Sequence, residues 1–112
     1  MTLLATMLAV LTITSWPQGL DGTKQTRTLR CNPPAGTLPM RTTACRKLAT
    51  LARPFAPVPK DAICTEIYGG PEVALVRGTF RGQRIWTYFR RRNGCEISRW
   101  NTVKFLFPAP GA

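Results

Sequence analysis

The sequence contains no histidine, and only five of its 112 residues are Asp or Glu. Histidine is the usual general base that activates a Ser or Cys nucleophile, and so few carboxylates leave little for acid–base chemistry. None of the four cysteines forms a C-x-x-C pair, so a zinc or copper site also lacks its usual ligands. The composition therefore argues against an enzyme, and we expect no catalytic residue, no metal and no cofactor.

The four cysteines are spaced C-x13-C-x18-C-x30-C along the chain. This spacing fits two disulfides better than a metal site, and each disulfide would stabilise a small domain by roughly 2–4 kcal/mol. Because disulfides persist in oxidising compartments, we expect a secreted, extracellular protein. Four cysteines allow three pairings, and the spacing alone does not choose among them.

Basic residues outnumber acidic ones by 16 to five, which gives a formal net charge of +11. Such a balance attracts nucleic acids, anionic membranes or acidic proteins. Many of the arginines are interleaved with aromatic residues (Trp86, Tyr88 and Phe89) in strand-like segments: Arg77, Arg81, Arg84, Arg90, Arg91 and Arg92. The alternation predicts aromatic side chains in the core and arginines in solvent. We therefore expect no nucleic-acid or membrane partner and interpret the charge as an aid to solubility.

The first 20 residues carry no charge and are rich in apolar side chains. Interruptions by Thr, Ser, Pro and Gln disfavour a transmembrane helix. A signal peptide would begin with basic residues, yet the first one is Lys24. We interpret residues 1–8 as an apolar extension or partial signal remnant, residues 9–108 as one folded domain and residues 109–112 as a tail.

Alternating and β-branched residues predict five strands, at 9–14, 25–30, 73–80, 83–90 and 103–107. Thr42 or Thr43 should cap a short helix that runs to Leu51, and a single helical turn is expected over residues 96–101. The Pro-rich segments 32–39 and 53–59 should be irregular. These elements together predict an α+β fold with an antiparallel sheet.

Five segments carry a resemblance to a known family: Leu29-Arg30-Cys31-Asn32-Pro33-Pro34-Ala35-Gly36-Thr37, Ala44-Cys45, Cys64-Thr65-Glu66-Ile67-Tyr68, Arg81-Gly82-Gln83-Arg84 and Asn93-Gly94-Cys95-Glu96-Ile97. In this order they resemble the Streptomyces subtilisin inhibitor family of serine protease inhibitors, over nearly the whole chain. Residues 9–108 would then be a subtilisin inhibitor-like domain. The resemblance implies a five-stranded antiparallel sheet with two short helices, disulfides Cys31–Cys45 and Cys64–Cys95, and a homodimer formed through the sheet.

The resemblance also implies a reactive bond. In the family this bond follows the second residue after the loop cysteine, which corresponds here to Glu66–Ile67. Glu66 would enter the primary specificity pocket of a serine protease. The other implied site residues are the protease-contacting Ile63, Thr65, Tyr68 and Gly69, and Asn93, which would hydrogen-bond the loop from behind.

Glu66 stands where the family often has Met or Lys. A carboxylate buried in an apolar pocket is costly unless a cation pairs with it. The target is therefore either a glutamate-specific protease or a subtilisin-like enzyme that leaves Glu66 partly solvated. We further expect Gly69-Gly70 to loosen one flank of the loop and Arg99 to be a solvated surface residue. The alternative function is a cationic secreted protein that binds polyanions or membranes on the same scaffold.

Overall fold

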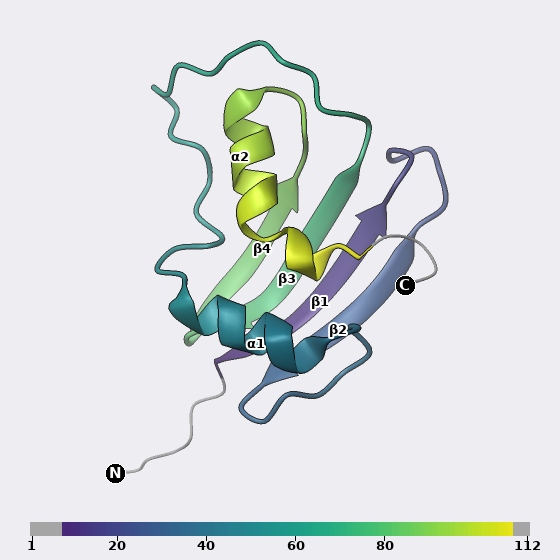
Figure 1. Ribbon diagram of the computed structural model, residues 1–112, viewed down its shortest axis with the longest axis vertical. Helices are drawn as coiled ribbons and strands as arrows, with labels where there is room; N and C mark the ends of the chain where they lie inside the picture. The colour runs from purple at the N-terminus through teal and green to yellow at the C-terminus, as the bar shows by residue number, and fades with distance from the viewer. Residues whose placement is uncertain (1–7, 109–112) are drawn as a thin grey trace.

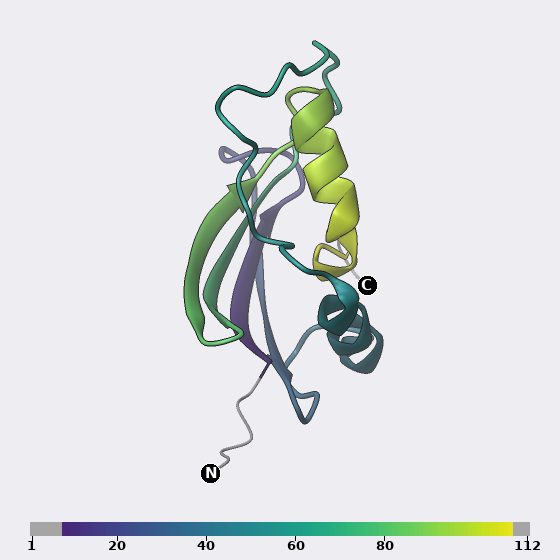
Figure 2. The ribbon, with the colours of Figure 1, turned by 90° about the vertical axis from the view of Figure 1, so that its left-hand side faces the viewer.

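The structure is a computed structural model that describes residues 8–108. The expected tail 109–112 and nearly all of the expected extension 1–8 lie outside the described residues. Within them, one antiparallel sheet and two α-helices form two layers, with both helices on the same face of the sheet (Figures 1 and 2). The predicted α+β class is confirmed.

The sheet has four strands in the spatial order β2-β1-β3-β4, and every neighbouring pair is antiparallel. Their bounds are β1 (Ala9–Trp16), β2 (Gln25–Cys31), β3 (Val73–Phe80) and β4 (Gln83–Phe89). Alternate residues of the central strand β1, such as Leu11 and Ile13, are buried beneath the helices. Leu11 is paired with Leu29 on one side and Gly78 on the other, so the core runs across the sheet.

The predicted fifth strand, 103–107, is wrong. Helix α2 (Gly94–Thr102) is followed directly by the 3-10 helix η1 (Lys104–Leu106). Val103 and Leu106, three residues apart, are both fully buried, whereas Phe105 and Phe107 only pack against the edge of the core. A spacing of three matches the 3-10 period, so this segment covers the sheet instead of extending it.

The helix boundaries also differ from the prediction. Helix α1 (Arg41–Thr50) begins after Met40, which has a left-handed φ of 55° and makes no side-chain cap. Thr42 and Thr43 therefore lie inside the first turn and are not the cap. Helix α2 has nine residues instead of one turn. The disulfide Cys31–Cys45 joins β2 to α1 and fixes that helix against the sheet.

Candidate functional site

The longest irregular connection, residues 51–72, joins α1 to β3 and passes over the N-terminal end of α2 (Figure 1). Near its middle, Cys64 is bonded to Cys95 in the first turn of α2, with the two Cα atoms 5.3 Å apart. The candidate site is the part of this connection around and just after Cys64, residues 63–69, called here the exposed loop.

The upstream flank of the exposed loop is anchored to the start of α2. The N–H of Gly94 donates to the carbonyl of Thr65 at 2.9 Å, beside the Cys64–Cys95 disulfide. A Cβ atom on Gly94 would overlap the hydroxyl of Thr65. Glycine at position 94 therefore allows the loop backbone to approach the helix closely enough for this hydrogen bond.

The downstream flank is anchored to the end of β4. The N–H of Gly69 donates to the carbonyl of Arg91 at 2.7 Å, and Nε of Arg91 donates back to the carbonyl of Gly69 at 3.1 Å. A Cβ atom on Gly69 would lie 2.8 Å from Cδ1 of Ile97, so any other residue here would displace the Ile97 side chain. We expected Gly69-Gly70 to loosen this flank, but Gly69 is fixed by two hydrogen bonds, both of them to Arg91.

Between the two anchors lie Glu66, Ile67 and Tyr68, and all three are exposed. Ile67 is 58% exposed and Tyr68 is 69% exposed, so both large side chains are available for contact with a partner. Within residues 8–108, no side chain forms an ion pair or hydrogen bond with the Glu66 carboxylate. The backbone around the Glu66–Ile67 bond is therefore accessible, while hydrogen bonds fix the chain on both sides of it, at Thr65 and Gly69.

Arg91 is a supporting residue that the sequence analysis missed. Its Nε lies 4.0 Å from Oε1 of Glu72, and its Nη1 donates to Oδ1 of Asn101 at 3.4 Å. Its guanidinium also lies 5.8 Å from the ring centre of Trp100. The only sequence signal was its place in a run of three arginines just before Asn93-Gly94-Cys95, a run that we interpreted as surface charge.

Asn93 lies at the start of α2, where its Oδ1 accepts a hydrogen bond from the N–H of Glu96 at 2.9 Å. Asparagine is a favourable N-cap because its side chain satisfies a backbone donor that the helix leaves free. No hydrogen bond joins the Asn93 side chain to the exposed loop among the described residues. Asn93 instead holds the turn of α2 that carries Gly94 and Cys95.

Arg99 is half-buried, so the expectation of a solvated surface arginine is wrong. Its guanidinium lies 3.9 Å from the ring centre of Phe89. It donates four hydrogen bonds of 2.6–3.4 Å, to the carbonyls of Phe55, Ala56 and Tyr88 and to the hydroxyl of Thr87. Burial lowers the pKa of Arg99, and the negative charge of Glu96 partly opposes that shift. Arg99 therefore ties the long connection to β4.

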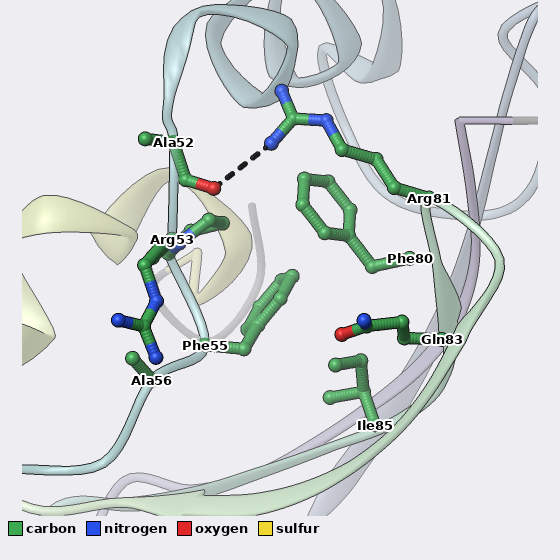
Figure 3. Close-up of a pocket in the computed structure, with 9 residues that line it drawn as sticks. Ala52, Arg53, Phe55, Ala56, Phe80, Arg81, Gln83 and Ile85 are labelled. Carbon is green, nitrogen blue, oxygen red and sulfur yellow. Dashed lines mark hydrogen bonds between the residues drawn. The ribbon is translucent and has the colours of Figure 1, made fainter.

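A hollow of about 460 Å³ lies between residues 52–56 of this connection and the β3–β4 turn (Figure 3). Arg81 borders it and donates to the carbonyls of Leu51 and Ala52 at 2.7 and 3.1 Å. Its guanidinium also donates to the carbonyls of Leu48 and Ala49, near the end of α1. These bonds satisfy carbonyls that a helix end leaves free, so Arg81 serves the fold.

Residues 8–108 contain no group of His, Cys, Asp and Glu that could hold a metal ion. Over the same residues, no helix has both the length and the apolar composition needed to cross a membrane.

The chain matches the family model described as "Subtilisin inhibitor-like" over residues 5–92. This match covers most of the chain, which therefore belongs to the subtilisin inhibitor-like family, a family of inhibitors and not of enzymes. The family inferred from the five segments is confirmed. The match ends at Arg92, so it does not include Asn93, Cys95 or any other residue of α2.

A solved structure with the same fold is that of Streptomyces caespitosus sermetstatin in complex with Bacillus licheniformis subtilisin. The two folds superpose with a TM-score of 0.50 at 23% sequence identity, over 84% of this chain and 94% of sermetstatin. No curated protein sequence matches the chain.

Proposed function

We propose that this protein inhibits serine proteases by presenting the exposed loop as a substrate, with Glu66–Ile67 as the reactive bond. The observation that carries the proposal is the position of this bond between two anchors, Thr65 on Gly94 and Gly69 on Arg91. Family membership supports the same function, and sermetstatin was captured in a complex with subtilisin.

The two anchors would make cleavage reversible. Attack by the protease serine on the Glu66 carbonyl would break the C–N bond, leave Glu66 as an acyl-enzyme and pass a proton to the nitrogen of Ile67. Thr65 and Cys64 would still hold the acyl side, and Gly69 would still hold the amine side. The new amine would therefore remain close to the acyl-enzyme, which favours resynthesis over hydrolysis.

Anchoring also reduces the cost of binding. A free loop loses conformational entropy when it enters an active site, whereas a fixed loop has already lost it on folding. Protease–inhibitor interfaces of about 1,600 Å² are accordingly among the tightest known. Ile63, Thr65 and Tyr68 are the exposed neighbours that we assign to protease contact, and we assign Gly69 to the downstream anchor.

The chemistry of Glu66 leaves two target classes. A glutamate-specific protease would supply a cation for the carboxylate, which has no partner among residues 8–108. A subtilisin-like protease would have to leave the carboxylate partly solvated, because burying it unpaired is costly. Secretion of the protein remains a prediction from its disulfides, and a homodimer through the sheet remains a prediction from the resemblance.

The test is titration of subtilisin and of a glutamate-specific protease with the oxidised protein, followed by mass spectrometry of any bond cut slowly at low pH. We expect stoichiometric inhibition of at least one protease and cleavage confined to Glu66–Ile67. The variant Glu66→Met should bind subtilisin more tightly. Asp21→Met, which removes an acidic group in the β1–β2 connection, is the matched control and should leave inhibition unchanged.

Digestion without inhibition would refute the proposed function. Inhibition with slow cleavage at another bond would retain the function and refute the assignment of Glu66–Ile67.

A further inference from the structure

The charge of the protein is distributed unevenly along the molecule. Four of its five acidic residues lie in the connection that carries the exposed loop or in the first turn of α2: Asp61, Glu66, Glu72 and Glu96. Residues 22–60, in contrast, contain eight basic residues and no acidic one. This segment includes α1, which lies at the end of the sheet far from the exposed loop (Figures 1 and 2). Unbalanced positive charge is therefore concentrated away from the proposed inhibitory loop.

A hollow of about 480 Å³ lies at this basic end, where the last turn of α1 meets the end of α2 and η1. Lys47, Thr50 and Leu51 line it from one side, and Asn101, Thr102, Lys104 and Phe105 line it from the other. We call it the interhelical hollow. It combines two cationic side chains with three polar uncharged ones, so it is suited to a polar, anionic ligand.

The two lysines of the interhelical hollow are exposed, and neither Lys47 nor Lys104 pairs with a carboxylate among residues 8–108. Nζ of Lys47 lies 5.5 Å from the ring centre of Phe105, a cation–π contact that favours a position of the ammonium beside the hollow. Arg46, the neighbour of Lys47 on α1, is also exposed. These cations would attract an anionic group to the hollow.

The two threonines of the interhelical hollow add hydrogen-bond acceptors. The hydroxyl of Thr50 donates to the carbonyl of Lys47 at 2.7 Å, and the hydroxyl of Thr102 donates to the carbonyl of Ser98 at 3.0 Å. A hydroxyl has one hydrogen to donate and two lone pairs to accept with. Because each hydrogen is already used, both oxygens can only accept from a ligand. A matching ligand therefore carries hydroxyl donors as well as anionic groups.

This requirement separates the classes of polyanion. A DNA strand or a polyphosphate has anionic groups but no hydroxyl donors along its chain, whereas every unit of an acidic polysaccharide has both. An anionic membrane is a poor match as well, because a helix that binds a membrane inserts an apolar face. The buried apolar residues of α1, which are Ala44, Cys45 and Leu48, face the core of the protein instead.

We propose that the interhelical hollow binds an acidic polysaccharide, with Lys47 and Lys104 on its acidic groups and with Thr50 and Thr102 accepting from its hydroxyls. The polymer would hold the protein on an anionic matrix while the exposed loop, at the other end of the molecule, remains accessible. The helices cover one face of the sheet, so a homodimer through the sheet would leave the hollow open (Figure 2). This binding does not depend on the proposed inhibition.

The probe is a fluorescein-labelled oligogalacturonate, compared with its methyl ester and with a polyphosphate of equal charge. The ester keeps the ring hydroxyls and loses the charge, whereas the polyphosphate keeps charge and has no hydroxyls along its chain. We expect the ester to bind about tenfold more weakly than the free acid, which is the effect of losing two exposed ion pairs. The affinity for the acid should also fall with rising salt, because exposed charges are screened.

Variants separate the lysine contacts from the hydroxyl contacts. Lys47→Gln and Lys104→Gln should each weaken binding of oligogalacturonate about threefold, and together about tenfold. Thr50→Val and Thr102→Val should each weaken it about threefold and leave polyphosphate binding unchanged. The matched control Lys24→Gln removes an exposed lysine from the β1–β2 connection and should leave the affinity for oligogalacturonate unchanged.

Equal losses in Lys24→Gln and Lys47→Gln, or unchanged binding in both valine variants, would overturn the proposal in favour of general electrostatic attraction. Polyphosphate that binds more tightly than oligogalacturonate and depends on Lys47 and Lys104 would instead identify a phosphate polymer as the occupant. Protease inhibition should be the same in all of these variants and in the presence of saturating oligogalacturonate. Inhibition that the oligomer abolishes would refute a bound state in which the exposed loop remains accessible.

Discussion

The substitution Arg91→Ala tests whether the exposed loop must be fixed, and not only exposed, to inhibit a protease. It removes the guanidinium that donates to the Gly69 carbonyl at 3.1 Å, but it leaves the main-chain bond from the Gly69 N–H to residue 91 in place. The downstream flank would then have one hydrogen bond instead of two. The upstream anchor at Thr65 would be unchanged.

The size of the effect follows from the lost contacts. A hydrogen bond from a charged donor contributes about 1.5–3 kcal/mol when buried. The Arg91 side chain is 22% exposed, and its second bond, to Asn101, is long at 3.4 Å. We therefore expect a stability loss of about 1–2 kcal/mol, around and below the lower end of that range, because solvent screens the partly exposed guanidinium. If a similar amount is lost from loop fixation, protease binding weakens about tenfold.

The assay compares Arg91→Ala with Arg92→Ala, which removes the same charge from the next residue. The Arg92 side chain is 64% exposed and, among residues 8–108, pairs only with Glu96, at 3.6 Å, so its loss should change inhibition little. Arg91→Ala should raise the dissociation constant of the protease complex and speed cleavage of the bound loop. Arg91→Lys keeps a charged donor and should retain part of the inhibition. Equal inhibition constants and equal cleavage rates for both alanine variants would refute a positioning role for Arg91.

Three further predictions concern the same corner of the molecule. Replacing both Cys64 and Cys95 by Ser should lower the free energy of unfolding by about 3.7 kcal/mol, given the sequence separation of 31, as measured by denaturant titration. The same double variant should be cleaved as a substrate, as measured by the rate of loop cleavage. Gly94→Ala should weaken inhibition severalfold because its Cβ displaces Thr65, and Thr65→Ala in the same chain should restore part of it. Asn93→Ala should lower the free energy of unfolding by about 1 kcal/mol. Asn93→Ser should preserve the helix cap and leave the inhibition constant unchanged; a loss of inhibition in this variant would contradict a role of Asn93 through the cap.

Four strands were predictable because their sequences alternate and end at turn residues. The same logic failed at 103–107, where Val-Lys-Phe-Leu-Phe fits a period of two as well as a spacing of three. Packing determines the outcome, because the core buries Val103 and Leu106 together. A short apolar segment does not reveal which period its surroundings will select.

Alternation also did not decide which face of β4 is inside. Ile85 and Phe89 point to the core side, whereas Trp86 and Tyr88 lie with Arg84 on the side of the sheet away from the helices. Trp86 is 63% exposed, so the expectation that the interleaved aromatics lie in the core is wrong for this residue. Both faces of this strand carry apolar side chains, so the pattern fits either orientation. Pairing with β3 determines the orientation, because the inward-facing Val76 is paired with Thr87, which shares a side of β4 with Ile85 and Phe89.

The position of the exposed loop was predictable, but its support was not. Cys64 and the Glu66–Ile67 bond belong to one of the segments that carry the family resemblance, so the resemblance pointed to them directly. The anchors at Thr65 and Gly69 are backbone hydrogen bonds to residues more than 20 positions away. Every residue except proline has an N–H and every residue has a carbonyl, so such bonds leave no local sequence signal.

Both anchors reach the same short segment of the chain, residues 91–95. Arg91 holds the downstream flank, and Gly94 with Cys95 holds the upstream flank. This segment is itself fixed, because β4 precedes it and the Asn93 cap starts α2 within it. The distance between the loop's two ends is therefore set by one rigid corner and not by two elements that move independently. A loop held in this way can be cut without its ends separating, and that property distinguishes a substrate-like inhibitor from a substrate.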